Sequence, residues 1–258
     1  MDWFAQRARA AYGSQAEIIK KFPDTVRVAT VPGTDVQYFL ERDSAHRRQV
    51  ISVRGTYNLG NLREDAEFNP DKNAILGIYV HAGFDADAFK VYQDVLPHLQ
   101  KGESVRVTGH SLGAAISTLL MMYLHLDGFR VEPSINFGQP KLTDLAGAQA
   151  WEFLPLLRVV DRDDLVPLLP PKDWLDPVHG AFRHFGREVI LLDQTYYVYL
   201  SEHQDMLQPR VSSFWDNLGS ESLEDHRIDN YLRRITDKLQ RAMQVPYKQR
   251  ELYQSLNL

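Results

Sequence analysis

The sequence lacks cysteine, an excess of basic charge and any uncharged stretch long enough to span a membrane. Without cysteine, disulfides and thiolate metal sites are excluded. The net charge of -5 offers no basic surface for nucleic acid. Charged residues also interrupt positions 1–9, where a signal peptide needs its apolar core. We therefore expect no nucleic-acid partner, no transmembrane segment, and a cytoplasmic location by absence of a signal peptide, or secretion if a leader was removed.

Cofactor motifs are missing as well. The sequence has no aspartate-rich calcium loop, no glycine-rich phosphate loop and no zinc-ligand spacing. Repeats, low-complexity tracts and breaks in composition that would mark a linker are absent too. With 44% hydrophobic and 24% charged residues, the composition is that of a globular protein. We expect one domain over residues 1–258 whose chemistry needs no cofactor and no metal; the oligomeric state is left open.

Strand-like and helix-like patterns alternate along the chain, which predicts the α/β class. Short β-branched or apolar runs bounded by turn residues predict strands at 26–30, 36–41, 49–54, 105–108, 135–137, 156–160, 189–192 and 196–200. The short polar connection between the last two strands predicts a hairpin. Apolar residues at helical spacing predict helices at 2–22, 84–100, 116–126 and 228–243.

Ser111 is the predicted nucleophile. It stands in Gly109-His110-Ser111-Leu112-Gly113, the G-x-S-x-G pattern of a nucleophile elbow, between a predicted strand and a predicted helix. In such an elbow a strained turn lifts the serine hydroxyl clear of the sheet edge. The glycines are needed because strand and helix approach closely there, and a Cβ atom would clash. The pentapeptide also arises by chance, but the strand before it and the helix after it are the context that the motif requires.

A nucleophilic serine needs a base, and the base needs a carboxylate that fixes its tautomer. Active sites of open α/β sheets lie beyond the carboxyl ends of the parallel strands. Asp161, Asp163 and Asp164 follow the strand predicted at 156–160, so all three are placed to reach the site. Asp164 precedes an apolar step that would draw its carboxylate inward, whereas Asp161 and Asp163 flank Arg162 and are more readily solvated. A role of Asp164 as an ordinary loop carboxylate or helix cap is the alternative.

Elimination among seven of the nine histidines leaves one as the base. Three lie in a charged loop or within predicted helices, and His110 is inside the elbow, directed away from where Ser111 projects. His184 precedes a strand and His203 follows one that we expect to be antiparallel, which puts both at the wrong edge of the sheet. His226 remains, in a polar stretch before the last helix. The resulting order of serine, acid and histidine is that of the α/β-hydrolases, with a surface role of His226 as the alternative.

Six stretches of the sequence, taken in order, resemble the class 3 lipases, the fungal-type triacylglycerol lipases with an α/β-hydrolase fold. They are VRGT at 53–56, HAGF at 81–84, GHSLGAA at 109–115, NFGQP at 136–140, RVV at 158–160 with DLVP at 164–167, and DH at 225–226. The resemblance implies a mostly parallel central sheet flanked by helices, with a short lid segment. It also implies Ser111 as nucleophile, Asp164 as acid and His226 as base.

The sequence departs from the family at Asp161, where relatives commonly carry asparagine. This extra carboxylate lies three residues before Asp164. We expect it either to raise the pKa of Asp164 or to face solvent.

Two groups are candidates for the oxyanion hole, whose donors stabilise the tetrahedral intermediate. The backbone N–H of Leu112 opens the helix after the nucleophile, where the helix dipole adds partial positive charge. Thr56 follows the strand at 49–54 and Gly55, so it should emerge at the same edge of the sheet. The resemblance also implies the oxyanion residue at Thr56, with a side-chain hydroxyl beside its backbone N–H. An ordinary glycine-threonine turn is the alternative.

Residues 57–68, YNLGNLREDAEF, occupy the place where relatives carry a lid helix. Leu59, Leu62 and Phe68 offer a sparse apolar face, and Gly60 weakens a helix. We expect a small mobile lid with modest activation at an oil–water interface. The alternative is a polar loop that covers nothing.

Two further clusters are interpreted as structural. His81 should pack or bond near the start of the helix that follows it, rather than take part in catalysis. Tyr196, Tyr197 and Tyr199 should serve the strand and the core rather than an acyl-binding groove.

These residues together predict a serine carboxylic-ester hydrolase that acts through Ser111, His226 and Asp164 by way of an acyl-enzyme. The resemblance implies that it is a lipase that cleaves acylglycerol esters. Its substrate partner would be a lipid or ester, met in solution or at an oil–water interface. A short-chain esterase or a phospholipase on the same scaffold is the alternative in chemistry. A non-catalytic lipid-binding module is the alternative of another class, and it would need a broken triad.

Overall fold

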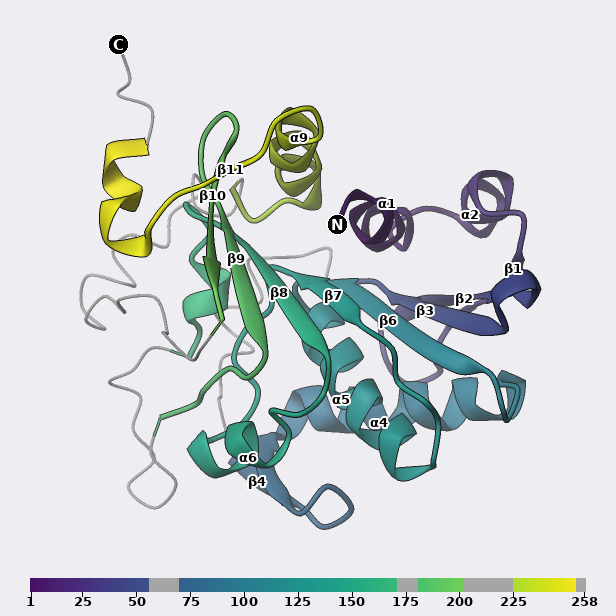
Figure 1. Cartoon of the computed structure of the whole chain (residues 1–258). Coiled ribbons are helices and arrows are strands. Elements are labelled where there is room, and N and C mark those ends of the chain that lie inside the picture. The colour runs from purple at the N-terminus through teal and green to yellow at the C-terminus, as the bar shows by residue number, and fades with distance from the viewer. Residues whose placement is uncertain (56–69, 171–180, 202–224, 254–258) are drawn as a thin grey trace.

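The computed structural model describes residues 1–55, 70–170, 181–201 and 225–253. Within these ranges a nine-stranded sheet is built in the order of the chain (Figure 1). Its strands are β1 (Thr25–Thr30), β2 (Gln37–Asp43), β3 (Arg48–Val53), β6 (Ser104–His110), β7 (Ser134–Phe137), β8 (Leu156–Asp161), β9 (Arg187–Leu191), β10 (Tyr196–Leu200) and β11 (Met243–Gln244).

The middle of the sheet is parallel. Strands β3, β6, β7, β8 and β9 run in one direction. β1 and β2 extend the sheet in antiparallel steps beyond β3, and β10 returns antiparallel to β9. Parallel strands are buried on both faces, and β3 and β6 are accordingly buried at nearly every position, polar residues included. The mostly parallel sheet and the hairpin of the last two predicted strands are confirmed.

Helices cover both faces of this sheet (Figure 1). One face carries α4 (Ala82–Val95), α5 (Leu112–Leu126) and α6 (Leu145–Ala150), and the other carries α1 (Asp2–Ala10), α2 (Gln15–Lys21) and α9 (Ile228–Lys238). α5 is buried almost all round, as expected of an apolar helix between a sheet and a neighbouring helix. α9 is amphipathic and packs Ile228, Tyr231 and Ile235 into a core shared with α1 and β7 to β9.

Two helix predictions are wrong in their extent. The helix predicted at 2–22 is two helices, because Ser14 begins α2 with a capping box to Glu17. The helix predicted at 228–243 ends at Lys238, because the chain beyond it turns to pair β11 with β10. The apolar spacing continues through both breaks, so periodicity alone does not reveal them.

Two further differences lie before β6. The helix predicted at 84–100 begins at Ala82 and ends at Val95, where the proline-containing 3₁₀ turn Leu96–His98 replaces it. A second sheet, β4 (Pro70–Asn73) with β5 (Ile78–His81), was not predicted. The Asn73 side chain closes its turn by accepting from two backbone N–H groups, a contact that hydrophobic patterning does not capture.

The parallel register brings the carboxyl ends of β3, β6 and β8 to one edge of the sheet, near the start of α9. None of the described helices has the length and apolar composition of a membrane span. The assignment of all 258 residues to one domain stays a prediction.

Candidate active site

Ser111 stands in a strained turn between β6 and α5. Its φ of 60° and ψ of -131° lie in a region that non-glycine residues rarely adopt. A Cβ atom at Gly109 would overlap the main chain of Gly113, and one at Gly113 would overlap the end of β3. The close approach of β6, α5 and β3 therefore requires both glycines, as the elbow motif predicts.

The Ser111 hydroxyl has no hydrogen-bond partner among the described residues, although its Oγ is buried. Buried hydroxyls are as a rule paired, so this one is an exception that needs a reason. The backbone N–H of Ser111 donates to the carbonyl of Phe137 at 3.0 Å, which ties the turn to the end of β7. A free hydroxyl on a fixed turn is suited to receive a substrate.

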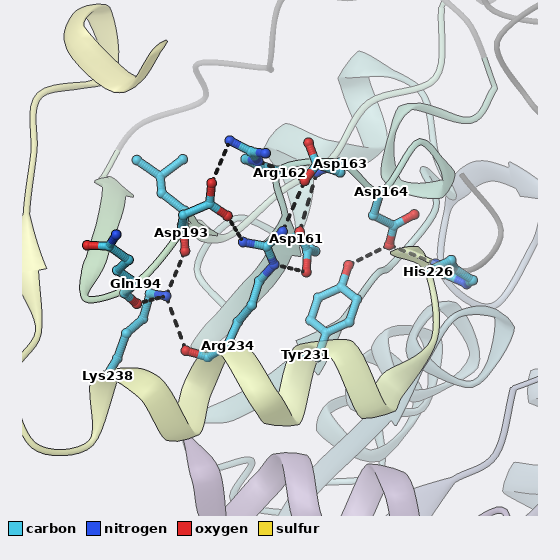
Figure 2. A network of polar contacts seen from close by, with 11 residues as sticks. Asp161, Arg162, Asp163, Asp164, Asp193, Gln194, His226, Tyr231, Arg234 and Lys238 are labelled. Carbon is cyan, nitrogen blue, oxygen red and sulfur yellow. Dashed lines mark hydrogen bonds and ion pairs between the residues drawn. The ribbon is translucent and has the colours of Figure 1, made fainter. Parts of the chain in front are cut away.

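Asp164 and His226 form a buried hydrogen-bonded pair (Figure 2). Nδ1 of His226 lies 2.7 Å from Oδ2 of Asp164, and both side chains are 0% exposed. Oδ1 of Asp164 accepts from the backbone N–H of Val166 at 2.9 Å, and the Tyr231 hydroxyl donates to Oδ2 at 2.5 Å. With Nδ1 donating, Nε2 of the neutral ring is an acceptor. This Nε2 atom is buried and has no partner among the described residues.

His110 in the elbow and Gly138 after β7 both lie against His226. The ring of His110, which precedes Ser111, lies 4.6 Å from the His226 ring between centroids. Gly138 follows the residue that accepts from the Ser111 N–H, and a Cβ atom at Gly138 would come within 2.9 Å of Cε1 of His226. The structure thus brings Ser111, Asp164 and His226 into one buried region beyond the carboxyl ends of β6 and β8.

Of the two oxyanion candidates, Leu112 lies within the described residues and Thr56 lies outside them. Leu112 is the first residue of α5, where a backbone N–H has no partner within its own helix. Gly55 lies against the nucleophile, because a Cβ atom there would come within 2.9 Å of Cβ of Ser111. Thr56 follows Gly55 but lies outside the described residues, as do the predicted lid residues 57–68.

Asp161 and Asp163 belong to a charged cluster with Arg162, Asp193 and Arg234 (Figure 2). Nε of Arg234 lies 2.7 Å from Oδ2 of Asp161, and its terminal nitrogens lie 2.5 Å from Asp193 and 3.0 Å from Asp163. Arg162 contacts Asp163 at 2.7 Å and Asp193 at 3.1 Å. Because Arg234 stands on α9, the charged cluster ties α9 to the ends of β8 and β9.

The expectation that Asp161 is readily solvated or faces solvent is wrong, because this residue is 1% exposed. Burial raises the pKa of the Asp161 carboxyl to about 7, although the neighbouring Arg234 acts to lower it. Asp161 ends β8 and meets its cation on α9, which is distant in sequence. The adjacent Arg162 therefore does not indicate the surroundings of Asp161, because the cation that pairs with its carboxylate comes from α9.

Other residues considered at the start have structural partners. Nδ1 of His81 accepts from the backbone N–H of Phe84 at 3.2 Å, and the two rings stack at 3.9 Å, which confirms the predicted role at the start of α4. His184 is buried, with Nε2 2.8 Å from the carbonyl oxygen of Pro167. The tyrosines of β10 pack against apolar clusters, as predicted. His203 lies outside the described residues, but the antiparallel direction of the strand before it is confirmed.

Three side chains that border this region are given no role by the sequence patterns. Tyr231 bonds to Asp164, while His110 bonds to Tyr12 and to the backbone of His226. Tyr231 lies on the apolar face of the predicted last helix, which was the available signal for it. In the part of the chain that the structure describes, no group of three or more histidine, aspartate or glutamate side chains is arranged to hold a metal ion.

Residues 50–174 match the family model described as Lipase (class 3), which confirms the predicted resemblance. Secreted mono- and diacylglycerol lipase 1 of Fusarium solani is 29% identical over 197 residues, covering 66% of this chain and 54% of that protein. Phospholipase A1 PLIP2, chloroplastic, of Arabidopsis thaliana is 31% identical over 114 residues, covering 40% of this chain and 16% of that protein. The chain spans about half the length, or less, of the curated relatives that it matches.

The fold has close counterparts among solved structures. The crystal structure of a lipase from Rhizopus microsporus var. chinensis matches with a TM-score of 0.64 and 25% identity, covering 74% of this chain and 73% of that one. The central sheet and its flanking helices are therefore those of the α/β-hydrolase fold.

Proposed function

From its established likeness to the class 3 lipases, we propose that this protein is a serine hydrolase, a lipase that cleaves the carboxylic esters of acylglycerols. One observation carries the proposal. The Asp164–His226 pair is buried and hydrogen-bonded at 2.7 Å, and its Nε2 lies in the same region as the Ser111 hydroxyl, neither atom having a partner among the described residues. Nucleophile, base and orienting acid are the parts that serine hydrolysis requires.

In the first half-reaction, Oγ of Ser111 attacks the carbonyl carbon of the ester, and its proton passes to Nε2 of His226. Asp164 accepts from Nδ1 throughout, which holds the ring in one tautomer and stabilises the imidazolium that forms. The tetrahedral intermediate then collapses. His226 returns the proton to the departing alcohol oxygen, and the acyl group stays on Ser111.

In the second half-reaction, water attacks the acyl carbon, and His226 takes a proton from it. Collapse of the second intermediate releases the carboxylic acid and returns the proton to Oγ of Ser111. Atoms and charges balance with water as the only co-reactant. No step uses a cofactor.

The backbone N–H of Leu112 and the residue Thr56 are the proposed oxyanion donors. Support comes from the position of Leu112 at the start of α5, where the helix dipole favours negative charge. Gly55, directly before Thr56, lies against Ser111. Loss of one such donor typically lowers the rate on the order of a hundredfold or more.

Replacement of the nucleophile tests the proposal. Ser111→Ala should lower kcat on a dissolved short-chain ester by at least about a thousandfold, because no other group there can form the acyl-enzyme. Ser117→Ala is the matched control, since Ser117 is also buried without a side-chain partner among the described residues but stands within α5. Retention of most activity by Ser111→Ala would show that Ser111 is not the nucleophile. Failure of a fluorophosphonate to label the wild-type protein at Ser111 would instead favour a non-catalytic lipid-binding module.

The substrate class needs its own test. The Fusarium relative is named a mono- and diacylglycerol lipase, and the Arabidopsis relative is named a phospholipase A1. Hydrolysis should be profiled on acylglycerols and phosphatidylcholines with short to long acyl chains, dissolved and emulsified, with Ser111→Ala as the blank. The proposal expects the highest kcat/KM on acylglycerols. A maximum on phospholipids or on the shortest dissolved esters favours the alternative activities.

Residues 57–68 are the proposed lid, with modest activation at an oil–water interface. Their narrow apolar face is the support for a modest effect. Replacement of residues 58–67 by glycine and serine should flatten the rise in rate at the solubility limit of the substrate. An unchanged, smooth profile speaks for a polar loop without a covering role.

The location of the protein stays a prediction. The Fusarium relative is named as secreted, which favours the exported alternative over the cytoplasm. Activity measured in the medium and in the lysate of the native host distinguishes the two locations.

A further inference from the structure

We propose that His110 and Tyr12 are positioning residues that hold the backbone of His226 where its imidazole can serve Ser111. The proposal rests on the proposed function, because it takes His226 as the base. Two hydrogen bonds between residues distant in sequence carry it.

The first hydrogen bond joins the elbow to the base. Nε2 of His110 lies 2.6 Å from the backbone carbonyl oxygen of His226, which is 116 positions further along the chain. The two rings are inclined by 32°. Both residues are buried, so the bond is shielded from solvent. The residue before the nucleophile is thereby bonded to the main chain of the base.

The first hydrogen bond also determines which nitrogen of His110 carries the hydrogen, and the second hydrogen bond fits that tautomer. A carbonyl oxygen only accepts, so Nε2 must be the donor. Nδ1 of the neutral ring is then an acceptor, and the Tyr12 hydroxyl lies 2.8 Å from it and donates. Burial, and after it the neighbouring His226, lowers the pKa of His110 well below its ordinary value. The ring is therefore neutral and places no charge beside the base.

These bonds supply a constraint that Asp164 alone does not. Asp164 holds the His226 ring at Nδ1, whereas His110 holds the main chain from which that ring extends. A shift of about 1 Å in a catalytic group can cost on the order of a hundredfold in rate. Loss of the His110 bond should therefore lower kcat and leave KM nearly unchanged.

Two substitutions at one position separate this role from simple space filling. The amide nitrogen of glutamine reaches about as far as Nε2 of histidine, whereas that of asparagine reaches only as far as Nδ1. His110→Gln can still donate to the His226 carbonyl, so its kcat should stay within about threefold of wild type. His110→Asn cannot, and its kcat should fall at least about thirtyfold with KM within about twofold.

Tyr12→Phe tests the tautomer. Without its hydroxyl, His110 can place the hydrogen on Nδ1 and turn a lone pair toward the His226 carbonyl, so kcat should fall about three- to tenfold. Tyr92→Phe is the matched control, because Tyr92 also donates a 2.8 Å hydrogen bond, to Asp127, and lies on α4. The thermal unfolding midpoint of each variant shows whether the fold is kept.

Equal kcat for His110→Gln and His110→Asn, or losses borne mainly by KM, overturns the proposal. If His110→Asn does not fold, the comparison of Tyr12→Phe with its control Tyr92→Phe tests the proposal instead. Equal kcat for these two variants then overturns it. The proposed function fails separately, when Ser111→Ala stays active or wild type is not labelled by the fluorophosphonate. Labelled, active wild-type enzyme with unaffected variants refutes the positioning role alone.

Discussion

The contacts that hold His226 and the helix after it differ in charge. The main chain of His226 is held by a neutral pair, Tyr12 and His110, through hydrogen bonds of 2.8 and 2.6 Å. Two residues later α9 begins, and Arg234 anchors it within the charged cluster defined above. Neutral contacts leave the imidazolium of the reaction undisturbed by further charge, whereas ionic contacts secure the helix but depend on pH. Four substitutions probe this difference.

The largest effect is expected when the charged cluster loses its cation. Arg234→Met leaves Asp161 buried without its partner at 2.7 Å, and breaking a buried pair in this way costs about 3–5 kcal/mol. Urea unfolding at pH 8 measures the loss. In the double variant Asp161→Asn with Arg234→Met most of it should be recovered, because neither charge of the buried pair remains. A loss of less than about 1 kcal/mol for Arg234→Met contradicts the anchoring role.

The pH dependence of stability should come from the charged cluster and not from the neutral pair. Burial raises the pKa of Asp161 from the unfolded value of 3.8 to about 7, so the folded state binds this proton more tightly. The resulting stabilisation is complete below pH 4 and is lost as pH rises through 7.

Asp161→Asn removes this titration. The free energy of unfolding of wild type, relative to Asp161→Asn, should therefore fall between pH 5 and pH 8 by on the order of 1–3 kcal/mol. Denaturant unfolding of both proteins at the two pH values measures it. A constant difference, or one that grows with pH, excludes a raised pKa of Asp161.

A smaller effect is expected at Tyr231, which stands on α9 and donates to the carboxylate that orients His226. Tyr231→Phe removes the donor at 2.5 Å from Asp164, and a hydrogen bond to a charged group contributes about 1.5 kcal/mol or more. Because Asp164 orients His226, kcat on a dissolved ester should fall about tenfold with KM unchanged. A rate within twofold of wild type shows that the bonds from Val166 and His226 suffice.

The smallest effect is expected at an exposed ion pair that joins α9 to α1. Arg9 lies 2.8 Å from Asp229 and joins α1 to α9, but the two side chains are 46% and 55% exposed. Exposed pairs contribute little, so Asp229→Ala should change the free energy of unfolding by no more than about 0.5 kcal/mol and leave kcat unchanged. A loss comparable to that of Arg234→Met shows that burial is not what distinguishes the charged cluster.

Local patterns were sufficient for the parts of the fold and site that depend on near neighbours. The elbow around Ser111 follows from two glycines between a strand and a helix, and the inward position of Asp164 follows from the apolar residues after it. The break before Ser14 and the end of α9 at Lys238 were not predicted. A cap and a distant strand decide these boundaries, and neither changes the spacing of the apolar residues.

The amino-acid order alone determined the α/β class, the strained turn at Ser111 and the inclusion of Asp164 and His226 among the candidates. Only the tertiary structure decided that Asp161 meets Arg234 in the interior and that His110 meets Tyr12 and His226. The physical reason is sequence separation. Strand and turn patterns act over a few residues, whereas the partners of His110 lie 98 positions before it and 116 positions after it, and only packing of α1 and α9 on the sheet brings them together.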